Sequence, residues 1–210
     1  MIRTLLLASE SPRRRELAKR LGFPLETVSP KLDEAAVSRA FLTAGGAVQE
    51  LPRRLAEAKA EAAYAAAQPA VGTLVLAADT IVLLDGEILH KPEDLEEARE
   101  MLRALSGRVH QVITGVALKE KESLLSFAEE TSVYFYPLDS EQELEIERYL
   151  ATGGPLDKAG AYGIQEGGAF LIQRIEGDYL NVVGLPLARL RRQLLTFSAQ
   201  QSAEPSLQNT

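Results

Sequence analysis

Residues 109–136 read VHQVITGVAL, KEKE and SLLSFAEETSVYFY, and they decide which kind of sheet this protein forms. The segments 109–118 and 124–136 are rich in valine, isoleucine, threonine and aromatic residues, which favour strands. Little more than the charged turn at 119–122 separates them. A connection this short joins antiparallel strands, so the sequence predicts a hairpin within the sheet.

Outside this hairpin, buried strands alternate with helices. Apolar runs at 2–8 and 73–78 predict buried strands, and Asp85-Gly86 predicts a tight turn in a second hairpin at 81–89. Further strands are expected at 25–28 and 169–175, and helices at 12–21, 33–43, 52–67, 94–105, 140–150 and 186–197. Helices interleaved with strands and hairpins predict an α/β fold with a mixed sheet and flanking helices.

The chain has 210 residues, which is enough for one substantial domain. No internal repeat or low-complexity linker interrupts residues 1–197, so we expect a single domain there. Residues 198–210 are polar and show no periodicity, and a disordered tail is expected for them.

The composition excludes several classes of protein. Without cysteine the chain has no disulfide, thiol nucleophile or zinc ribbon, and its two histidines cannot form a three-histidine metal centre. Any metal is therefore expected to be a hard cation held by carboxylates and substrate oxygens. A net charge of −7 argues against general nucleic-acid binding. The apolar runs are too short for a membrane helix or a signal peptide, so a cytoplasmic protein is expected.

The common signatures of nucleotide and hydrolase chemistry are missing. The sequence contains no GxxxxGK[ST] phosphate loop, no GxGxxG dinucleotide fingerprint and no GxSxG nucleophile elbow. If this protein handles phosphates, it does so by another design.

Residues 8–16 read ASESPRRRE and lie where a strand leads into a helix N-terminus. Free backbone N–H groups at a helix N-terminus favour anions. Arginines there oppose the helix dipole, so helix stability alone does not explain them. We interpret Arg13 and Arg14 as phosphate-binding residues, and Arg15 as part of a solvated basic face.

Three other segments carry candidate residues with more than one interpretation. Asp79 ends a buried strand, and a metal ligand and a turn-capping residue are equally good interpretations. Lys91 stands beside Pro92, where a surface loop charge is the simpler interpretation. Asp157 and Lys158 lie in a glycine-rich stretch that is either a ligand-binding loop or a flexible connector.

Taken together, five blocks in order resemble the Maf family of nucleotide pyrophosphatases. They read LASESPRRREL, AADTIVLLDGEILHKP, LSGRVHQVITGVAL, GGPLDKAGAYGIQ and GDYLNVVGLPL, and they cover the chain from Leu5 to about Leu187. The resemblance implies a mixed α/β fold with two lobes around a deep cleft, similar to inosine triphosphate pyrophosphatase. It also implies cleavage between the α- and β-phosphates with a divalent cation, Mg²⁺ or Mn²⁺.

The resemblance also implies roles for single residues. Asp79 matches the catalytic carboxylate of the family, and Ser9 and Arg14 match its phosphate-binding start. Its other polar cleft residues correspond to Glu34, Lys59, Lys91, Asp157 and Lys158. The positions that vary with base preference correspond to Arg13, Thr80 and Gln165, a set that resembles the subfamily acting on dTTP and UTP. The chain departs from the family in a longer segment between Glu34 and Lys59, and in His90, which replaces a small residue.

These assignments suggest a mechanism for a nucleoside triphosphate substrate. We hypothesise that Asp79 and Glu34 hold the metal, and that Asp79 orients or deprotonates the attacking water. The phosphates would be neutralised by Lys59, Lys91, Lys158 and Arg14. Thr80 and Gln165 would hydrogen-bond the pyrimidine. The sequence does not decide the oligomeric state, and a homodimer is one expectation.

Two alternatives stay open at this point. The chain could instead hydrolyse 7-methyl-GTP or another modified nucleotide. It could also be a nucleotide-binding regulator of septum formation without turnover, since the family was first named for effects on septum formation.

Overall fold

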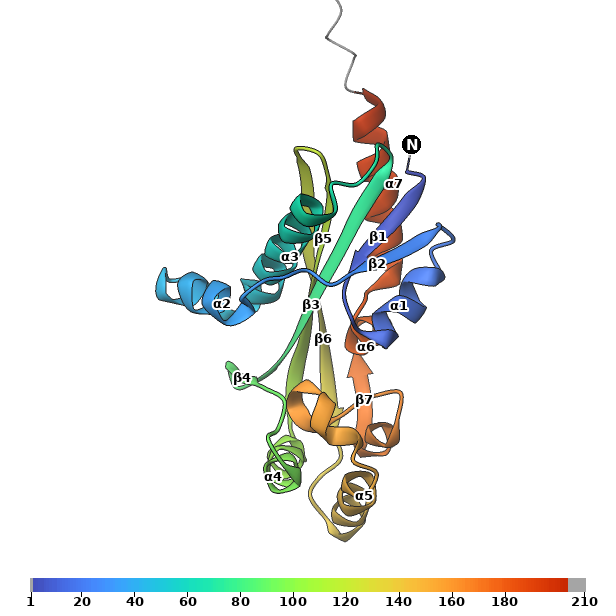
Figure 1. Ribbon diagram of the computed structural model, residues 1–210. Coiled ribbons are helices and arrows are strands. Elements are labelled where there is room, and N and C mark those ends of the chain that lie inside the picture. The colour runs from blue at the N-terminus through green and yellow to red at the C-terminus, as the bar shows by residue number, and fades with distance from the viewer. Residues whose placement is uncertain (1, 204–210) are drawn as a thin grey trace, which may run out of the picture. The chain divides into compact units, whose positions relative to one another are not determined.

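The computed structural model describes the backbone of residues 2–203 and the side chains of residues 2–197 (Figure 1). The strands are β1 Thr4–Ala8, β2 Leu25–Val28, β3 Thr73–Leu84, β4 Glu87–Leu89, β5 Val109–Glu120, β6 Ser123–Phe135 and β7 Ile172–Glu176. The α-helices are α1 Pro12–Lys19, α2 Glu34–Thr43, α3 Leu51–Ala67, α4 Leu95–Leu105, α5 Ser140–Leu150, α6 Tyr179–Val183 and α7 Leu187–Ala203. Short 3-10 helices are η1 Val48–Glu50, η2 Gly154–Asp157, η3 Ala159–Ala161 and η4 Gly167–Leu171.

Within the described residues the strands form one seven-stranded mixed sheet, in the order β2-β1-β3-β5-β6-β7 with β4 paired to β3. β1 runs parallel to both β2 and β3, whereas β4 and β7 are antiparallel to their neighbours. β5 and β6 are neighbours joined by Lys121 and Glu122 alone, as a hairpin requires. The prediction of an α/β fold with a mixed sheet is therefore confirmed.

The chain divides into two compact units. The first unit consists of Met1–Asp79, Gly115–Ala128 and Leu185–Thr210, and the second of Thr80–Thr114 and Glu129–Gly184. β3, β5 and β6 contribute residues to both units, so each unit has its own section of the sheet. The cleft expected between two lobes stays a prediction.

In the first unit, side chains alternate between the two faces of the sheet section. Leu6, Ala8, Val75 and Ala77 form a cluster with the small residues Ala56, Ala60 and Ala63 of α3. Alanines on the buried stripe of this helix let its backbone approach the strands closely. Their neighbours in sequence, among them Leu5 and Leu76, are also buried and point to the other face.

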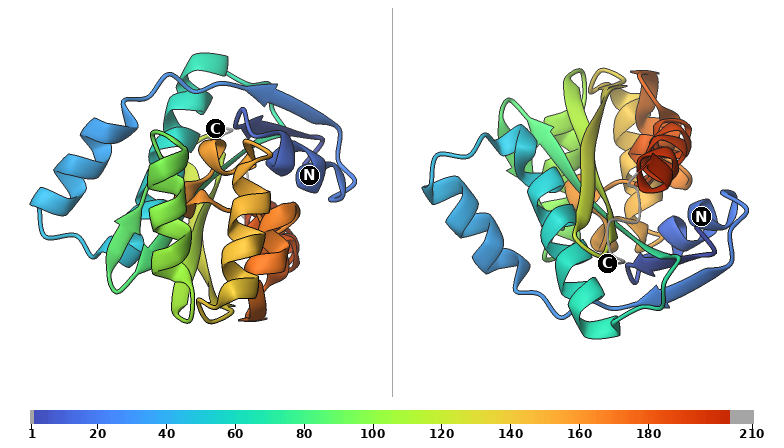
Figure 2. Two further views of the ribbon diagram at one scale, coloured as in Figure 1. Left: turned by 90° about the horizontal axis from the view of Figure 1, so that it is seen from below. Right: turned by 90° about the horizontal axis from the view of Figure 1, so that it is seen from above.

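Helix α7 lies on the opposite side of this sheet section from α3 (Figure 2, right). Its buried residues include Leu190, Leu194 and Phe197. Arg191 of α7 donates a hydrogen bond of 2.7 Å to the carbonyl of Leu21, directly after α1. The first unit is therefore a sheet section covered by α3 on one face and by α7, bonded to the end of α1, on the other.

The second unit has a separate core. Val82, Val112 and Phe135 of the sheet section form one cluster with Leu102 of α4 and Ile146 of α5. The two helices run side by side (Figure 2, left) and are joined by ion pairs from Arg99 to Glu147 and from Arg103 to Glu143. These pairs are exposed, so the shared apolar core supplies most of the packing energy.

Three predicted features differ in the structure. The strand expected to end at Ala78 continues to Leu84, because β3 pairs with β4 after it has left β1. Residues 167–171 form η4 rather than the start of a strand. Helix α7 extends to Ala203, into the expected tail, because alanine and glutamine propagate an existing helix readily. Residues 204–210 of that tail lie outside the described residues.

The hairpin turn expected at Asp85-Gly86 is confirmed. Both residues have positive φ angles, 53° for Asp85 and 85° for Gly86, as a two-residue hairpin turn of type I′ requires. Among the described residues, no helix is both long and apolar enough to cross a membrane.

Candidate active site

The candidate site of the first unit forms where β1 ends beside β3. Ala8, the last residue of β1, pairs with Ala77 of the parallel strand β3. Ser9 directly follows β1, and by this register it is level with Ala78, the residue before Asp79 in β3. Ligands of α/β proteins bind outside the carboxyl ends of parallel strands. Asp79 is an interior residue of β3, and it lies beside the carboxyl end of the neighbouring strand β1.

Lys59 joins two carboxylates at this position. Its Nζ lies 2.6 Å from Oδ1 of Asp79 and 2.9 Å from Oε2 of Glu34. Lys59 comes from α3, and Glu34 begins α2, where Asp33 caps the helix by accepting a hydrogen bond from the amide of Ala36. The structure thus brings together three of the residues predicted for the site.

The burial of this cluster is costly. Lys59 is 8% exposed and Asp79 is 9% exposed, whereas about half of the Glu34 side chain is in contact with solvent. Removing a lysine and a carboxylate from water costs several kcal/mol for each ion, and their mutual attraction does not always offset that cost. A buried ion pair that opens toward an exposed carboxylate is therefore weak evidence for stability. It is better evidence for a site that handles charge.

The N-terminus of α1 adds positive charge near the same carboxylates. Ser11 caps the helix by accepting from the amide of Arg14, and the buried Ser9 hydroxyl accepts from the amide of Ser11 at 3.2 Å. Burial lowers the pKa of the Arg14 guanidinium, while the negative charges of Asp79 and Glu34 act in the opposite direction. Arg14 therefore lies within electrostatic reach of both carboxylates.

Arg13 and Arg15 occupy neighbouring positions in the same helix. Arg13 is partly buried, and its charge contributes to the lowered pKa of Arg14. Arg15 is exposed, which agrees with the interpretation as a solvated basic residue. The first turn contains no acidic residue to balance these charges.

Thr80 belongs to the second unit and is partly buried. Its Oγ1 lies 2.9 Å from Oγ1 of Thr114, and Thr114 in turn donates to the backbone carbonyl of Asn181 at 3.1 Å. Thr114 and Asn181 are both fully buried. Buried hydrogen bonds therefore connect Thr80 through Thr114 to the backbone of Asn181 in α6.

Lys158 is the buried cation of the second unit. Its Nζ donates to the carbonyl of Gly154 and forms ion pairs with Asp157 and Glu166. Burial alone would lower the pKa of this ammonium, but hydrogen bonds to the two carboxylates outweigh that effect and raise its pKa. At Gly163 a Cβ would stand 2.6 Å from Cε of Lys158, so this glycine makes room for the lysine side chain.

Lys91 and Gln165 have exposed side chains. Lys91 follows His90, and the backbone carbonyl of His90 accepts a hydrogen bond from the amide of Gly160. This bond holds the backbone next to Lys91 against the glycine-rich stretch. His90 itself is exposed. The structure thus places Lys91, Gln165, Asp157, Lys158 and Thr80 in the second unit, and Ser9, Arg13, Arg14, Glu34, Lys59 and Asp79 in the first.

His110 has a structural role in the second unit. Its Nε2 lies 2.7 Å from the hydroxyl of Tyr162, and both rings meet Phe135 edge to face. Burial lowers the pKa of His110 to about 3, so the imidazole is neutral near pH 7. Tyr162 lies in the glycine-rich stretch and fastens it to β5.

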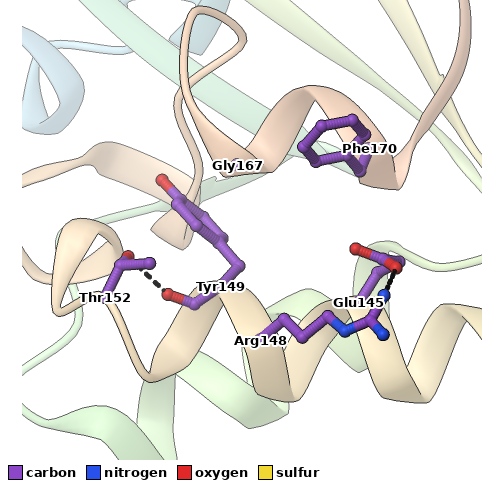
Figure 3. Close-up of a pocket in the computed structure, with 6 residues that line it drawn as sticks. All are labelled: Glu145, Arg148, Tyr149, Thr152, Gly167 and Phe170. Carbon is purple, nitrogen blue, oxygen red and sulfur yellow. Dashed lines mark hydrogen bonds and ion pairs between the residues drawn. The ribbon is translucent and has the colours of Figure 1, made fainter.

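A pocket of about 390 Å³ opens between the end of α5 and η4 (Figure 3). Its lining residues are Glu145, Arg148, Tyr149, Thr152, Gly167 and Phe170. None of the predicted site residues lines this pocket, and Glu145 and Arg148 pair with each other. We therefore place the candidate chemistry at Asp79 rather than here.

Three residues of these clusters were not predicted from the sequence. Thr114 and Asn181 support Thr80, and Glu166 pairs with Lys158. A threonine in the middle of the apolar run at 112–118 is a weak signal of a buried hydrogen bond. Nothing in the sequence indicates which residue is its partner.

Comparison with known proteins agrees with the resemblance. The Maf family, described as Maf-like protein, matches residues 4–197. A dTTP/UTP pyrophosphatase of Symbiobacterium thermophilum is 51% identical, covering 92% of this chain and 93% of that protein. Proteins of the same name are 46% identical in Bacillus cytotoxicus, covering 94% and 97%, and 45% identical in Pectobacterium atrosepticum, covering 95% of each. This chain belongs to the Maf family.

Proposed function

We propose that this protein hydrolyses dTTP and UTP to the nucleoside monophosphate and pyrophosphate. Relatives of that name match more than nine tenths of the chain at 44–51% identity. The structural observation that carries the proposal is the Lys59 ammonium between Asp79 and Glu34, with Arg14 within electrostatic reach. Such a cluster combines groups that bind phosphate with groups that bind a hard cation.

Arg14, Lys59 and the start of α1 would bind the phosphates. A triphosphate carries about four negative charges near neutral pH, and they must be offset before water attacks. Arg14 and Lys59 supply fixed cations, and the positive end of the α1 helix dipole adds to them. We also assign Lys91, Asp157 and Lys158 to the substrate site, because they match polar cleft residues of the family.

The two carboxylates fit a divalent cation that arrives with the substrate. Both form ion pairs with one ammonium, so their oxygens face a common point. Among the described residues, no group of three or more acidic, histidine or cysteine side chains could hold an ion. Mg²⁺ commonly binds one or two carboxylates and completes its shell with phosphate oxygens and water. Asp79 and Glu34 would hold such an ion, which would offset phosphate charge.

Asp79 would also position the attacking water. Lys59 holds Oδ1 of this carboxylate at 2.6 Å and thereby fixes its orientation in a nearly buried site. A fixed carboxylate can accept a proton from water as the water approaches the α-phosphorus. The bond between the α-phosphorus and the bridging oxygen then breaks, and pyrophosphate leaves.

Base recognition would use Arg13, Thr80 and Gln165. Thr80 directly follows Asp79 in β3, so the residue that reads the base is covalently next to the residue that acts on water. A site whose polar groups are left unpaired by the wrong base discriminates strongly even with few contacts.

The test is pyrophosphate release from dTTP, UTP, CTP, GTP, ATP and 7-methyl-GTP with Mg²⁺ or Mn²⁺. The proposal expects the highest kcat/KM for dTTP and UTP, and no release after chelation of the metal. A preference for 7-methyl-GTP would replace the proposed substrate but keep the reaction. Binding without release from any of the six would contradict the enzyme and support a nucleotide-binding regulator.

A further inference from the structure

The hydroxyl of Tyr149 holds the glycine-rich stretch through a backbone hydrogen bond. Tyr149 belongs to the last turn of α5, and its side chain is buried, at 2% exposure. Its hydroxyl oxygen accepts a hydrogen bond of 3.0 Å from the amide of Gly163, 14 residues further along the chain. A buried helical side chain thus reaches a stretch that is built of turns and short 3-10 helices.

The ring of Tyr149 is fixed by close contact with glycine backbone. A Cβ at Gly167 would stand 2.7 Å from Cδ2 of the ring, and a Cβ at Gly154 would stand 3.1 Å from Cε2. Figure 3 shows the ring beside Gly167. Residues without a side chain let the backbone come this close to the ring. The ring therefore has little room to move, and its hydroxyl is a stationary acceptor.

Gly163 also closes the turn that carries Gln165. The carbonyl of Gly163 accepts a hydrogen bond of 3.1 Å from the amide of Glu166. Gln165 lies inside this turn, and its side chain is exposed. One end of Gly163 is thus bonded to Tyr149 and the other to Glu166. The position of Gln165 therefore depends on where Tyr149 holds Gly163.

We propose that Tyr149 is a specificity-determining positioning residue, whose hydroxyl fixes the turn from which Gln165 reads the base. This inference rests on the proposed function, which assigns Gln165 to the pyrimidine. Uracil carries an oxygen at C4, whereas cytosine carries an amino group there. A hydrogen bond is lost when its two heavy atoms move apart by about 1 Å. Gln165 can therefore discriminate between the two bases only while its turn is held in place.

The experiment compares kcat/KM for UTP and CTP in the wild-type protein and in Tyr149→Phe, with Mg²⁺ or Mn²⁺. The substitution keeps the ring among its glycines and removes only the acceptor for the Gly163 amide. Gly163 is partly exposed, so water can satisfy this amide and the variant is expected to fold. A water molecule does not fix the turn, and we expect the UTP-to-CTP ratio to fall by about threefold to tenfold.

Two further variants separate positioning from structure. If Tyr149 acts through Gln165, Tyr149→Phe lowers the ratio in the wild-type protein but not in the Gln165→Ala variant. Ile146→Val is the control for stability, because Ile146 is fully buried in the same helix, three residues before Tyr149. Loss of its methyl group should lower the melting temperature and leave the ratio unchanged.

The outcomes distinguish this inference from the function on which it rests. If Gln165→Ala lowers the ratio and Tyr149→Phe does not, the inference is wrong and the proposed function stands. A fall of the same size in Ile146→Val, or after Tyr149→Phe in the Gln165→Ala variant, would show a structural effect and contradict the inference. If Gln165→Ala keeps the wild-type ratio, the role of Gln165 at the base and the inference fail together, while hydrolysis stands. Absence of pyrophosphate release by the wild-type protein would overturn the proposed function as well.

Discussion

The ammonium of Lys59 lies 2.6 Å from a carboxylate oxygen of Asp79, and both side chains are almost completely buried. They are 20 residues apart in sequence and come from a helix and a strand of the same compact unit. Glu34 extends the pair toward solvent. An ion pair of this kind gives the protein both a fixed carboxylate and a cation that a phosphate group can approach.

Asp79→Asn is expected to abolish turnover and leave the fold intact. The amide has nearly the same shape, but it neither accepts a proton from water nor binds a divalent cation strongly. We expect kcat to fall by about a hundredfold or more, a loss typical of removing a catalytic acid–base group. The measurement is pyrophosphate release from dTTP, with circular dichroism to verify folding. Glu61→Gln is the control, since Glu61 pairs with the buried Lys119 in the same unit and should keep activity. Retention of most activity by Asp79→Asn would rule out the assigned role.

Lys59→Met should lower the free energy of unfolding more in the wild-type protein than in the Asp79→Asn variant. Removing one partner of a buried pair leaves an uncompensated charge, at a cost of about 3 kcal/mol. In the Asp79→Asn variant, Lys59→Met leaves no unpaired carboxylate at position 79. The loss of unfolding free energy should therefore be smaller. The difference, a coupling of about 1–3 kcal/mol, is measured by urea unfolding of the two single variants and the double variant. Equal costs in both backgrounds would show that the two groups are not energetically coupled.

Local signals predicted most of the elements. The bounds predicted for β2 and α5 coincide with the structure, at 25–28 and 140–150, because Pro24 and Asp139 stand just before them. The hairpin at 81–89 was predicted, but its continuity with the strand at 73–78 was missed, because β3 is paired first with β1 and then with β4, which only the folded chain shows. The 3-10 turns near Lys158 were missed because they depend on contacts with residues such as His90 and Tyr149.

The residues of the candidate site also divide into those with a local sequence signal and those that depend on contacts between distant segments. Ser9 and Arg14 stand next to the end of β1 and the start of α1, which local patterns reveal, whereas the strand end predicted at Asp79 lies inside β3. Lys59 fits any solvated helical face by its sequence, and its burial appears only when α3 packs on β3. The partners Thr114 and Glu166 were not found at all, because hydrogen bonds between distant segments leave no periodic signal.

His110 predicts a loss of stability in mild acid. Burial lowers the pKa of the folded imidazole to about 3 from the ordinary value of 6.5, so the fold favours the neutral ring. The stabilising contribution of the neutral imidazole is complete above the ordinary pKa of 6.5. It is lost as the pH falls from there toward the pKa of about 3 in the folded protein. Between pH 6.5 and about pH 5 the loss should be about 1.5 kcal/mol.

The measurement is the free energy of unfolding in urea at several pH values. His110→Gln is the matched variant, because glutamine can keep the hydrogen bond to Tyr162 but does not titrate. Its stability should change much less over the same interval. Equal slopes in wild type and variant would show that His110 does not control the acid sensitivity.

Gly115→Ala is expected to displace the helix that carries Lys59. A Cβ at Gly115 of β5 would stand 2.2 Å from the carbonyl carbon of Pro52 and from the amide nitrogen of Arg53. Both are backbone atoms of α3, so no side-chain rotation can relieve the overlap and the helix must move. Overpacking of this kind costs about 1–3 kcal/mol. A displaced α3 also moves Lys59 relative to Asp79, and kcat should fall by about tenfold or more.

Gly154→Ala is the comparison for this variant, because its Cβ would meet only side-chain atoms, the nearest at 3.0 Å. Those side chains can shift by a few tenths of an ångström, so its stability and turnover should change less than those of Gly115→Ala. Melting temperature and pyrophosphate release from dTTP are measured for both variants. If Gly115→Ala is as stable and as active as wild type, α3 adapts without moving Lys59, and the close approach of α3 to β5 is not what positions the ion pair.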